Sequence, residues 1–128
     1  MPVTAPELVA AARSAIREIA PADCASVRPG SVLIDVREPG EFQDGHLPGA
    51  INLPRGVLEF QVDAHPAMAC ATAPALADRG RPVLLYCRSG GRAALAAQSL
   101  AAMGFSDVRS IAGGIQAWVE AGLPVVRP

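Results

Sequence analysis

Residues 82–92 read Pro82-Val83-Leu84-Leu85-Tyr86-Cys87-Arg88-Ser89-Gly90-Gly91-Arg92. A short apolar run here ends in a cysteine and a glycine-containing loop, and a stretch rich in alanine and leucine follows. This order predicts a buried strand, a tight loop and the start of a helix, with Cys87 at the junction. A cysteine in that position lies beside the free backbone amides and the positive end of the helix dipole.

These surroundings favour the thiolate form of Cys87, which is the nucleophilic form. Arg88 and Arg92 flank the sulfur, and a guanidinium keeps its positive charge at every physiological pH. Gly90 and Gly91 allow the backbone dihedrals that turn successive amides of Ser89 to Arg92 towards the sulfur, so the loop can also hold an oxyanion. The loop therefore predicts a sulfur nucleophile that attacks an anionic substrate.

Outward from this stretch, apolar runs alternate with helical patterns. The sequence predicts strands at Val32–Val36, Ile51–Leu53, Val83–Tyr86 and Val108–Ile111, and helices at Glu38–Asp44, Arg55–Phe60, Thr72–Arg79, Arg92–Met103 and Ile115–Ala121. Continuously apolar strands separated by helices are typical of an α/β fold with a small, mainly parallel β-sheet flanked by helices on both faces. Sites in such folds lie at the carboxyl ends of the strands, so Cys87 and Asp35 are expected to share one crevice.

The N-terminal segment carries a separate helix signal. Thr4 is followed three residues later by Glu7, which is the pattern of a capping box. One helical face then carries Leu8, Ala12, Ile16 and Ile19, and we expect this face to dock on the rest of the protein. The sequence predicts an amphipathic helix within residues 1–20 that packs on a domain spanning 21–128.

Composition limits the function. The chain has 128 residues, is 51% hydrophobic and 18% charged, and so predicts one folded domain. A net charge of −1 gives no electrostatic footprint for nucleic acid or an anionic membrane, and no such partner is expected. All 11 basic residues are arginine, which excludes Schiff-base chemistry on a lysine.

The cysteines indicate a reducing compartment. Cys24, Cys70 and Cys87 are an odd number at wide spacing, which is neither a disulfide framework nor a zinc motif. With no signal peptide and no apolar stretch of membrane-spanning length, we expect the protein to be cytoplasmic. Cys24 and Cys70 are expected to be structural thiols.

Several motifs together resemble one family, the single-domain rhodaneses. They are Asp35-Val36-Arg37-Glu38, Glu41-Phe42, Gly45-His46-Leu47-Pro48-Gly49-Ala50-Ile51-Asn52, the loop Cys87-Arg88-Ser89-Gly90-Gly91-Arg92, and Gly113-Gly114-Ile115-Gln116-Ala117-Trp118. The match runs from about Val32 to Leu123. Each piece alone is weak, but the pieces in this order with the cysteine loop intact are specific.

The resemblance implies a sulfurtransferase that works through a cysteine persulfide. Cys87 matches the persulfide-forming cysteine, and Arg88, Ser89, Gly90, Gly91 and Arg92 match the loop that cradles the outer sulfur and the donor anion. Family positions that brace this loop are matched by Asp35, Arg37, Glu41 and His46. The implied donor is thiosulfate or a low-molecular-weight persulfide, and the acceptor is cyanide, a thiol such as glutathione, or a protein thiol. No cofactor or metal is expected.

Arg55 follows Leu53-Pro54 and has two interpretations. It either lines the entrance of the substrate pocket and attracts the donor, or is simply solvated. The sequence favours neither.

Three alternative functions remain beside this one. A cysteine phosphatase or arsenate reductase usually has five residues between cysteine and arginine, with His before the cysteine; here there are four, and Tyr86 precedes Cys87. A regulatory rhodanese module commonly lacks the cysteine that is present here. A sulfur carrier that serves one protein partner uses the same chemistry, and nothing in the sequence separates it from a thiosulfate enzyme.

Overall fold

The computed structural model describes residues 2–62 and 74–128. Its centre is a five-stranded sheet with the strand order β1-β5-β4-β2-β3, and each pair of neighbouring strands is parallel. In chain order the elements are α1 (Ala5–Ala15), β1 (Arg17–Ile19), the 3-10 helix η1 (Pro21–Asp23), α2 (Cys24–Val27), β2 (Val32–Asp35), α3 (Pro39–Asp44), β3 (Ile51–Asn52), α4 (Leu58–Val62), the 3-10 helix η2 (Pro74–Ala77), β4 (Val83–Tyr86), α5 (Gly91–Ala102), β5 (Val108–Ile111) and α6 (Gly114–Glu120).

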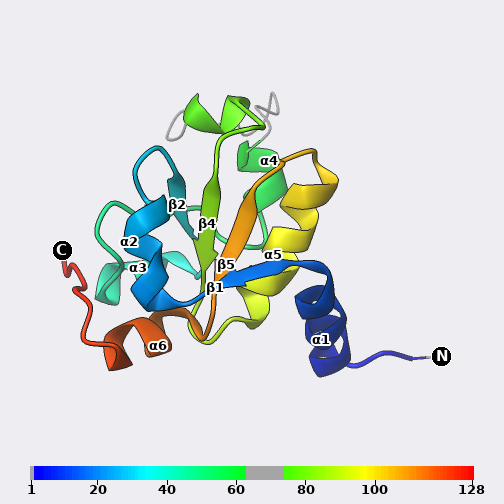
Figure 1. Ribbon diagram of the computed structural model, residues 1–128. Coiled ribbons are helices and arrows are strands. Elements are labelled where there is room, and N and C mark those ends of the chain that lie inside the picture. Colours follow the sequence, from blue (N-terminus) through cyan, green and yellow to red (C-terminus); the bar gives the residue numbers. More distant parts are fainter. Residues whose placement is uncertain (1, 63–73) are drawn as a thin grey trace.

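Helices cover both faces of this sheet, as the sequence predicts (Figure 1). α1, α4 and α5 lie on one side, and α2, α3 and α6 lie on the other. β4 is the central strand, and all four of its residues are buried. Apolar strands of this kind are expected where both faces of a parallel sheet are covered.

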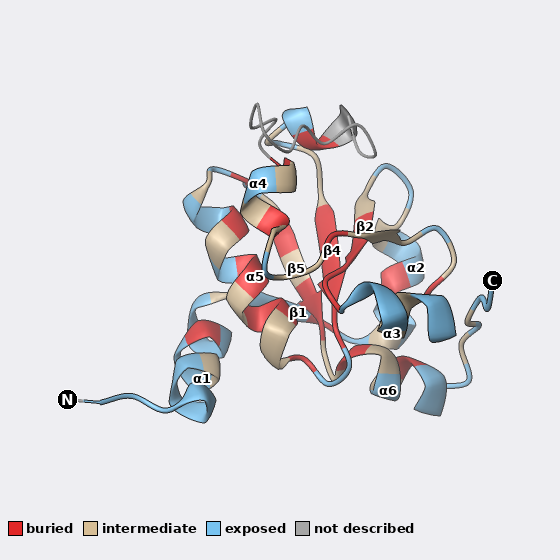
Figure 2. Ribbon diagram, turned by 180° about the vertical axis from the view of Figure 1, so that it is seen from behind, coloured by how far each residue is buried: buried red, intermediate tan, exposed pale blue. Residues whose placement is uncertain are grey.

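Two apolar cores result, one on each face of the sheet (Figure 2). Successive residues of a strand point to opposite faces. Leu85 and Cys87 therefore contribute to the core under α5, whereas Leu84 and Tyr86 contribute to the core under α6, which also holds Trp118. Cys87, the residue that follows the central strand, thus contributes to the core under α5.

α5 ends in a Schellman motif, which the sequence predicts because Gly104 follows the helical pattern and Phe105 follows Gly104. The amide of Phe105 donates to the carbonyl of Leu100 at 3.1 Å, and that of Gly104 donates to Ala101 at 3.1 Å. The pattern over Arg92–Met103 is nearly apolar all round and predicts a fully buried helix, but Gln98, Ala101 and Ala102 are exposed. α5 therefore has one buried alanine and leucine face and one solvent face.

The N-terminal helix is shorter than predicted. The capping box between Thr4 and Glu7 is present, but the helix ends at Ala15 and Arg17–Ile19 forms strand β1. β1 pairs in parallel with β5, from Arg17 opposite Arg109 to Ile19 opposite Ile111. The open edge of β5 offers backbone partners, and this tertiary pairing outweighs the weak helix preference of the β-branched residues at the helix end. Leu8, expected on the docking face, is exposed, while Ala12 is buried.

Two other predicted elements differ in detail. The helix expected at Arg55–Phe60 begins later, at Leu58, because a turn occupies residues 55–57. Of the helix expected at Thr72–Arg79, residues 72 and 73 lie outside the described residues. In the described part of this range the chain forms the 3-10 helix η2. Within residues 2–62 and 74–128, no helix is long and apolar enough to cross a membrane.

Candidate active site

Cys87 lies where β4 ends and the chain turns into α5. Its side chain is 1% exposed, and its Sγ accepts hydrogen bonds from the amides of Gly90 at 3.1 Å and Ala93 at 3.5 Å. Ala93 is in the first turn of α5, where backbone amides have no partner within the helix. The sulfur therefore lies in a cradle of backbone N–H groups, which stabilises negative charge on it.

Gly90 makes this cradle possible. Its φ is +121°, a region that residues with a side chain rarely adopt, and it immediately precedes α5. The turn brings its own amide back to the sulfur three residues earlier in the chain. Ala94 then donates to the Gly90 carbonyl at 2.9 Å, which starts the helix.

The outside of the loop is held by α6. The amide of Ile115 donates to the carbonyl oxygen of Cys87 at 2.9 Å, and the amide of Gln116 donates to that of Arg88 at 3.1 Å. A trans peptide points its carbonyl and its N–H in opposite directions. Fixing these carbonyls outward therefore fixes the amides that follow them towards the interior of the loop.

Gly114 allows α6 to come this close. Its φ is +61°, and a side-chain carbon placed on it would lie 2.4 Å from the carbonyl oxygen of Cys87. The glycine pair Gly113-Gly114, visible in the sequence only as a turn, is thus a contact with the cysteine loop. Two consecutive glycines shortly after a strand were the available signal for a close backbone approach.

Arg92 pairs with a carboxylate of α3. Its Nη1 lies 2.7 Å from Oε1 of Glu41 and its Nη2 lies 3.0 Å from Oε2, a bidentate arrangement. These hydrogen bonds lower the pKa of Glu41 to about 2. The pKa of Arg92 is raised, first by Glu41 and to a smaller extent by the charge of Cys87. Arg92 is therefore within electrostatic reach of the sulfur, but its charge is shared with Glu41.

A buried ion pair lies beneath the loop. Asp35, 0% exposed, accepts from the amide of Arg37 at 2.9 Å and from its guanidinium at 2.7 to 3.1 Å. Arg37 also donates to the carbonyl of Gly45 at 2.6 Å and lies 5.6 Å from the ring centre of Tyr86. Burial and the charge of Asp35 raise the pKa of the Tyr86 hydroxyl, which accepts from the amide of Leu47 at 3.1 Å. Through these contacts the end of β2 at Asp35 is connected to residues 45–47 and to Tyr86, the residue before Cys87.

His46 and Arg55 lie in polar contacts of their own. Nδ1 of His46 is 3.0 Å from the carbonyl oxygen of Phe42, and the two rings stack at 3.7 Å. The guanidinium of Arg55 contacts the Glu59 carboxylate at 3.0 Å and the Ser99 hydroxyl at 3.1 Å. Ser99 is seven residues beyond Arg92 on α5, a rise of about 10 Å along the helix. The structure brings Arg92, Glu41 and the Asp35 pair around the cysteine loop, and it holds Arg55 further along α5.

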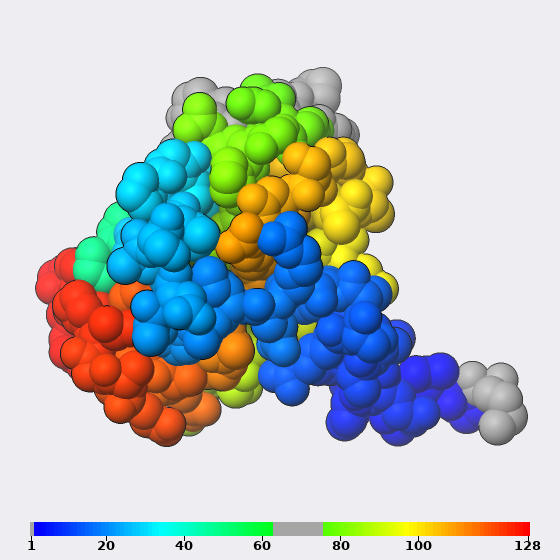
Figure 3. Space-filling model, viewed as in Figure 1, coloured from blue at the N-terminus to red at the C-terminus, as the bar shows by residue number. Residues whose placement is uncertain are grey.

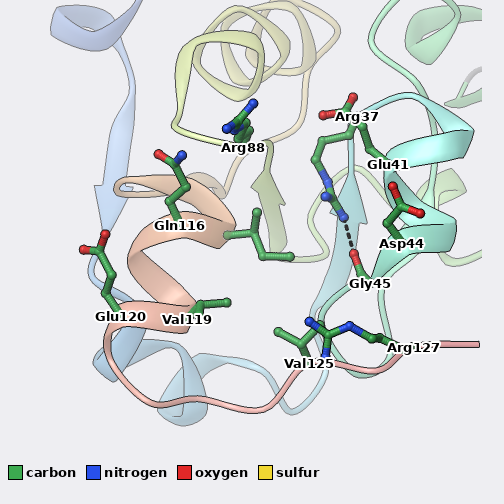
Figure 4. Close-up of a pocket in the computed structure, with 11 residues that line it drawn as sticks. Arg37, Glu41, Asp44, Gly45, Arg88, Gln116, Val119, Glu120, Val125 and Arg127 are labelled. Atoms are coloured by element: carbon green, nitrogen blue, oxygen red, sulfur yellow. Dashed lines mark hydrogen bonds between the residues drawn. The ribbon is translucent and has the colours of Figure 1, made fainter.

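A pocket of about 580 Å³ lies beside the loop, between α3 and α6 (Figure 4). The C-terminal segment forms its base, with Val125 and Arg127. Cys87 is not among its lining residues, whereas Arg88, the next residue, is. Charges of both signs line the pocket: arginines 37, 88 and 127 and the carboxylates of Glu41, Asp44 and Glu120.

Cys24 and Trp118 lie in the core away from the cysteine loop. Cys24 is buried and its thiol lies 3.6 Å from the carbonyl of Ala20; burial raises its pKa. Cys70 lies outside the described residues. Trp118 is 5% exposed and donates to the carbonyl of Pro124 at 2.8 Å, which makes it a core residue. Among the described residues, no group of His, Cys, Asp and Glu is arranged to hold a metal ion.

Comparison with known proteins agrees with this architecture. The model of the rhodanese-like domain matches residues 21–121. A sulfurtransferase of Allochromatium vinosum is 34% identical over 97 residues, which cover 76% of this chain and 79% of that protein. The thiosulfate sulfurtransferase GlpE of Pseudomonas syringae is 33% identical over 90 residues, which cover 70% and 73%.

A solved structure covers nearly the whole chain. It is a protein of unknown function from Rhodopseudomonas palustris, described as a possible tyrosine phosphatase, with a TM-score of 0.81 and 33% identity over 98% of this chain and 99% of that one. The family match and the sulfurtransferase relatives confirm the resemblance seen in the motifs. The chain belongs to the rhodanese-like domain family.

Proposed function

We propose that this chain is a sulfurtransferase that carries a sulfane sulfur on Cys87. The observation that carries the proposal is the pair of amides, from Gly90 and Ala93, that donate to Sγ in a loop whose carbonyls are fixed outward. Such a cradle stabilises a thiolate at Sγ, and further inward-pointing amides of the same loop can stabilise the anionic outer sulfur of a persulfide. Relatives of this chain are named sulfurtransferases.

The reaction has two displacement steps. In the first, the Cys87 thiolate attacks the outer, sulfane sulfur of thiosulfate; a new S–S bond forms, the S–S bond of thiosulfate breaks, and sulfite leaves with the electron pair. In the second, a thiophilic acceptor attacks the outer sulfur of the persulfide and the Cys87 thiolate is restored. Covalent catalysis of this kind gives ping-pong kinetics. A low-molecular-weight persulfide enters the first step in the same way, with a thiolate leaving.

Positive charge at the loop assists both steps, because donor, leaving group and persulfide are all anionic. Arg92 is within electrostatic reach of the sulfur, and Arg88 is exposed and lines the neighbouring pocket. We assign the pocket to the approach of donor and acceptor, since it opens beside the residue that follows Cys87. Asp35, Arg37 and His46 are proposed to brace the loop from below, and Arg55 lies outside this arrangement.

A phosphatase is the second candidate, since the Rhodopseudomonas palustris neighbour is described as a possible one. Two features of this chain disfavour it. The loop has four residues between Cys87 and Arg92, a small ring that suits one sulfur atom better than a tetrahedral phosphate. Arg92 is also engaged in a bidentate pair with Glu41, whereas a phosphate-binding arginine gives both its guanidinium N–H groups directly to the substrate.

Steady-state kinetics test the proposal against this candidate. Thiocyanate formation from thiosulfate and cyanide is expected to show parallel double-reciprocal plots and to be absent in Cys87→Ser. Hydrolysis of p-nitrophenyl phosphate is expected to be absent in both proteins. Phosphate release by the wild type without sulfur transfer from thiosulfate or glutathione persulfide would favour the phosphatase.

The alternative that this chain passes its sulfur to a protein acceptor is tested with the same wild-type protein. A sulfur carrier would load from a persulfide donor but release sulfur slowly to cyanide and glutathione.

We also propose that the protein acts in the cytoplasm. Cys24 and Cys87 are both free thiols, and thiols stay reduced in that compartment.

A further inference from the structure

The N-terminal helix reaches the cysteine loop. Nη2 of Arg13, near the end of α1, lies 3.5 Å from the carbonyl oxygen of Ser89. A side-chain carbon on Gly90 would lie 2.7 Å from the same Nη2, and one on Gly91 would contact Val9 of α1 at 3.6 Å. α1 lies outside the range 21–121 that the family model matches. Figure 3 shows this N-terminal segment as a projection at one corner of the molecule, with the far end of α1 away from the body.

The contact acts on a particular peptide unit. The carbonyl of Ser89 and the amide of Gly90 belong to the same peptide and point in opposite directions. Arg13 lies at the carbonyl end, and the amide end donates to Sγ of Cys87 at 3.1 Å. A positive charge at the carbonyl polarises the peptide and strengthens the hydrogen bond that its amide makes.

We propose that Arg13 is a positioning residue of the active site, which stabilises the anionic sulfur of Cys87 through the Ser89–Gly90 peptide. The inference rests on the proposed function for its biological meaning, but its physical content is the state of the Cys87 sulfur. Arg13 does not touch the sulfur, and it acts from outside the loop.

Arg13 completes a set of contacts that encloses the loop. The carbonyls of Cys87 and Arg88 are held by amides of α6, and the carbonyl of Ser89 is held by Arg13 of α1. Figure 1 shows the two helices on opposite sides of the loop at the carboxyl end of β4. Three consecutive carbonyls are thus fixed outward from two sides.

The expected effect is modest. The 3.5 Å separation is longer than a usual N–H···O hydrogen bond, the side chain is 45% exposed, and Glu18 lies 3.8 Å from Nε of Arg13. The charge of Arg13 is therefore partly screened. We expect a change of about fivefold in the reactivity of the sulfur, the size of the net contribution of one ordinary hydrogen bond and below that of a well-formed charge-assisted one.

The test is the rate at which the full-length protein is alkylated at Cys87 by iodoacetamide at pH 7, followed by peptide mass. Iodoacetamide is neutral, so the rate reports the sulfur and not the attraction of an anion. Arg13→Gln is expected to react about fivefold more slowly than wild type, and Arg13→Lys, which keeps the charge, is expected to recover most of the loss. Arg17→Gln is the matched control, because Arg17 is an exposed arginine that pairs with Asp107.

Turnover with thiosulfate provides a second readout. If Arg13 acts on the sulfur, kcat falls in Arg13→Gln by a factor similar to that in alkylation, while KM changes little. A wild-type alkylation rate in Arg13→Gln would overturn the inference. An alkylation rate as slow in Arg13→Lys as in Arg13→Gln would overturn the inference, because lysine keeps the positive charge. An equally slow rate in Arg17→Gln would also overturn it, because Arg17 does not contact the Ser89 carbonyl.

These results are separable from the proposed function. If wild type transfers sulfur but Arg13→Gln alkylates normally, the inference fails and the function stands. If Arg13→Gln alkylates slowly but wild type transfers no sulfur from any donor, the inference stands and the proposed function fails.

Discussion

Gly114 lies so close to the backbone of Cys87 that a side-chain carbon at Gly114 would be 2.4 Å from the Cys87 carbonyl oxygen. The next residue, Ile115, donates its amide to that same oxygen at 2.9 Å. The start of α6 and the end of β4 therefore form one interlocked unit. The geometry of the sulfur cradle depends on a residue that is 27 positions away in the sequence (114 minus 87).

Replacing this glycine should damage activity more than stability. In Gly114→Ala the added carbon must displace the carbonyls of Cys87 and Arg88, which shifts the loop that carries the sulfur and the Gly90 amide that donates to it. Small displacements of catalytic groups cost about 100-fold in rate, and we expect a loss of that order in sulfur transfer. The measurement is kcat/KM with thiosulfate, together with urea unfolding.

Gly122→Ala provides the matched control. Gly122 has a φ of +78°, so alanine is strained there too, but no atom lies within 4 Å of its added carbon. It should lose about 1 kcal/mol of stability and keep the wild-type rate. A similar loss of rate in both variants would mean that the contact with Cys87 is not what matters.

Arg92 should assist the donor, with Glu41 as its counterion. Arg92→Gln leaves the Glu41 carboxylate beside the loop without the guanidinium that it now binds, and this charge repels an anionic donor. We expect KM for thiosulfate to rise about tenfold with a smaller change in kcat. The double variant Arg92→Gln, Glu41→Gln should recover part of that loss. An unchanged KM in Arg92→Gln would contradict this role of Arg92.

The same pair should make stability depend on pH in acid. Hydrogen bonds from Arg92 lower the pKa of Glu41 from 4.5 to about 2, so the folded state favours the ionised form. The stabilisation is complete above pH 4.5 and is lost as the pH falls towards 2. Both side chains are about a third exposed (37% and 35%), and the contribution at pH 7 is about 1 kcal/mol after screening.

Urea unfolding of wild type and Glu41→Gln between pH 7 and pH 2.5 measures the contribution of the Glu41–Arg92 pair to stability. The free energies of unfolding should differ by about 1 kcal/mol at neutral pH and converge in acid. A difference that stays constant across this range would show that Glu41 does not contribute as an ionised partner of Arg92.

Asp35→Ala should be far more damaging to stability. It leaves the guanidinium of Arg37, whose side chain is 8% exposed, without its carboxylate. Breaking a buried pair on one side costs about 3–5 kcal/mol. Arg17→Ala breaks an exposed pair with Asp107 and should cost about 0–1 kcal/mol, measured by urea unfolding of both variants. A loss below 1 kcal/mol in Asp35→Ala would contradict the bracing role of the pair.

The sequence was sufficient for the parts of the fold that local patterns determine. The apolar run at Val83–Tyr86, the loop after it and the α5 pattern place Cys87 correctly at a strand-to-helix junction. The capping box at Thr4 and the helix end at Gly104 were also readable, because each depends on residues a few positions apart.

What the sequence could not provide are contacts between distant segments. Arg17–Ile19 continues a helical pattern, and only the open edge of β5 makes it a strand. Arg13 reads as a solvated charge on a surface helix, yet it lies at the carbonyl of Ser89, 76 residues away. The pairing of Arg92 with Glu41, 51 residues apart, is invisible until the fold brings the first turns of α3 and α5 together at the carboxyl ends of the strands.

The most direct test of Cys87 as the sulfur carrier is the intact mass of the protein under non-reducing conditions after incubation with thiosulfate, with Cys87→Ser in parallel. We expect one added sulfur atom on the wild type, removed by cyanide, and none on Cys87→Ser. A sulfur adduct that persists in Cys87→Ser would contradict the assignment of Cys87 as the sulfur carrier. No adduct on the wild type, with thiosulfate or with glutathione persulfide, would contradict the sulfurtransferase itself.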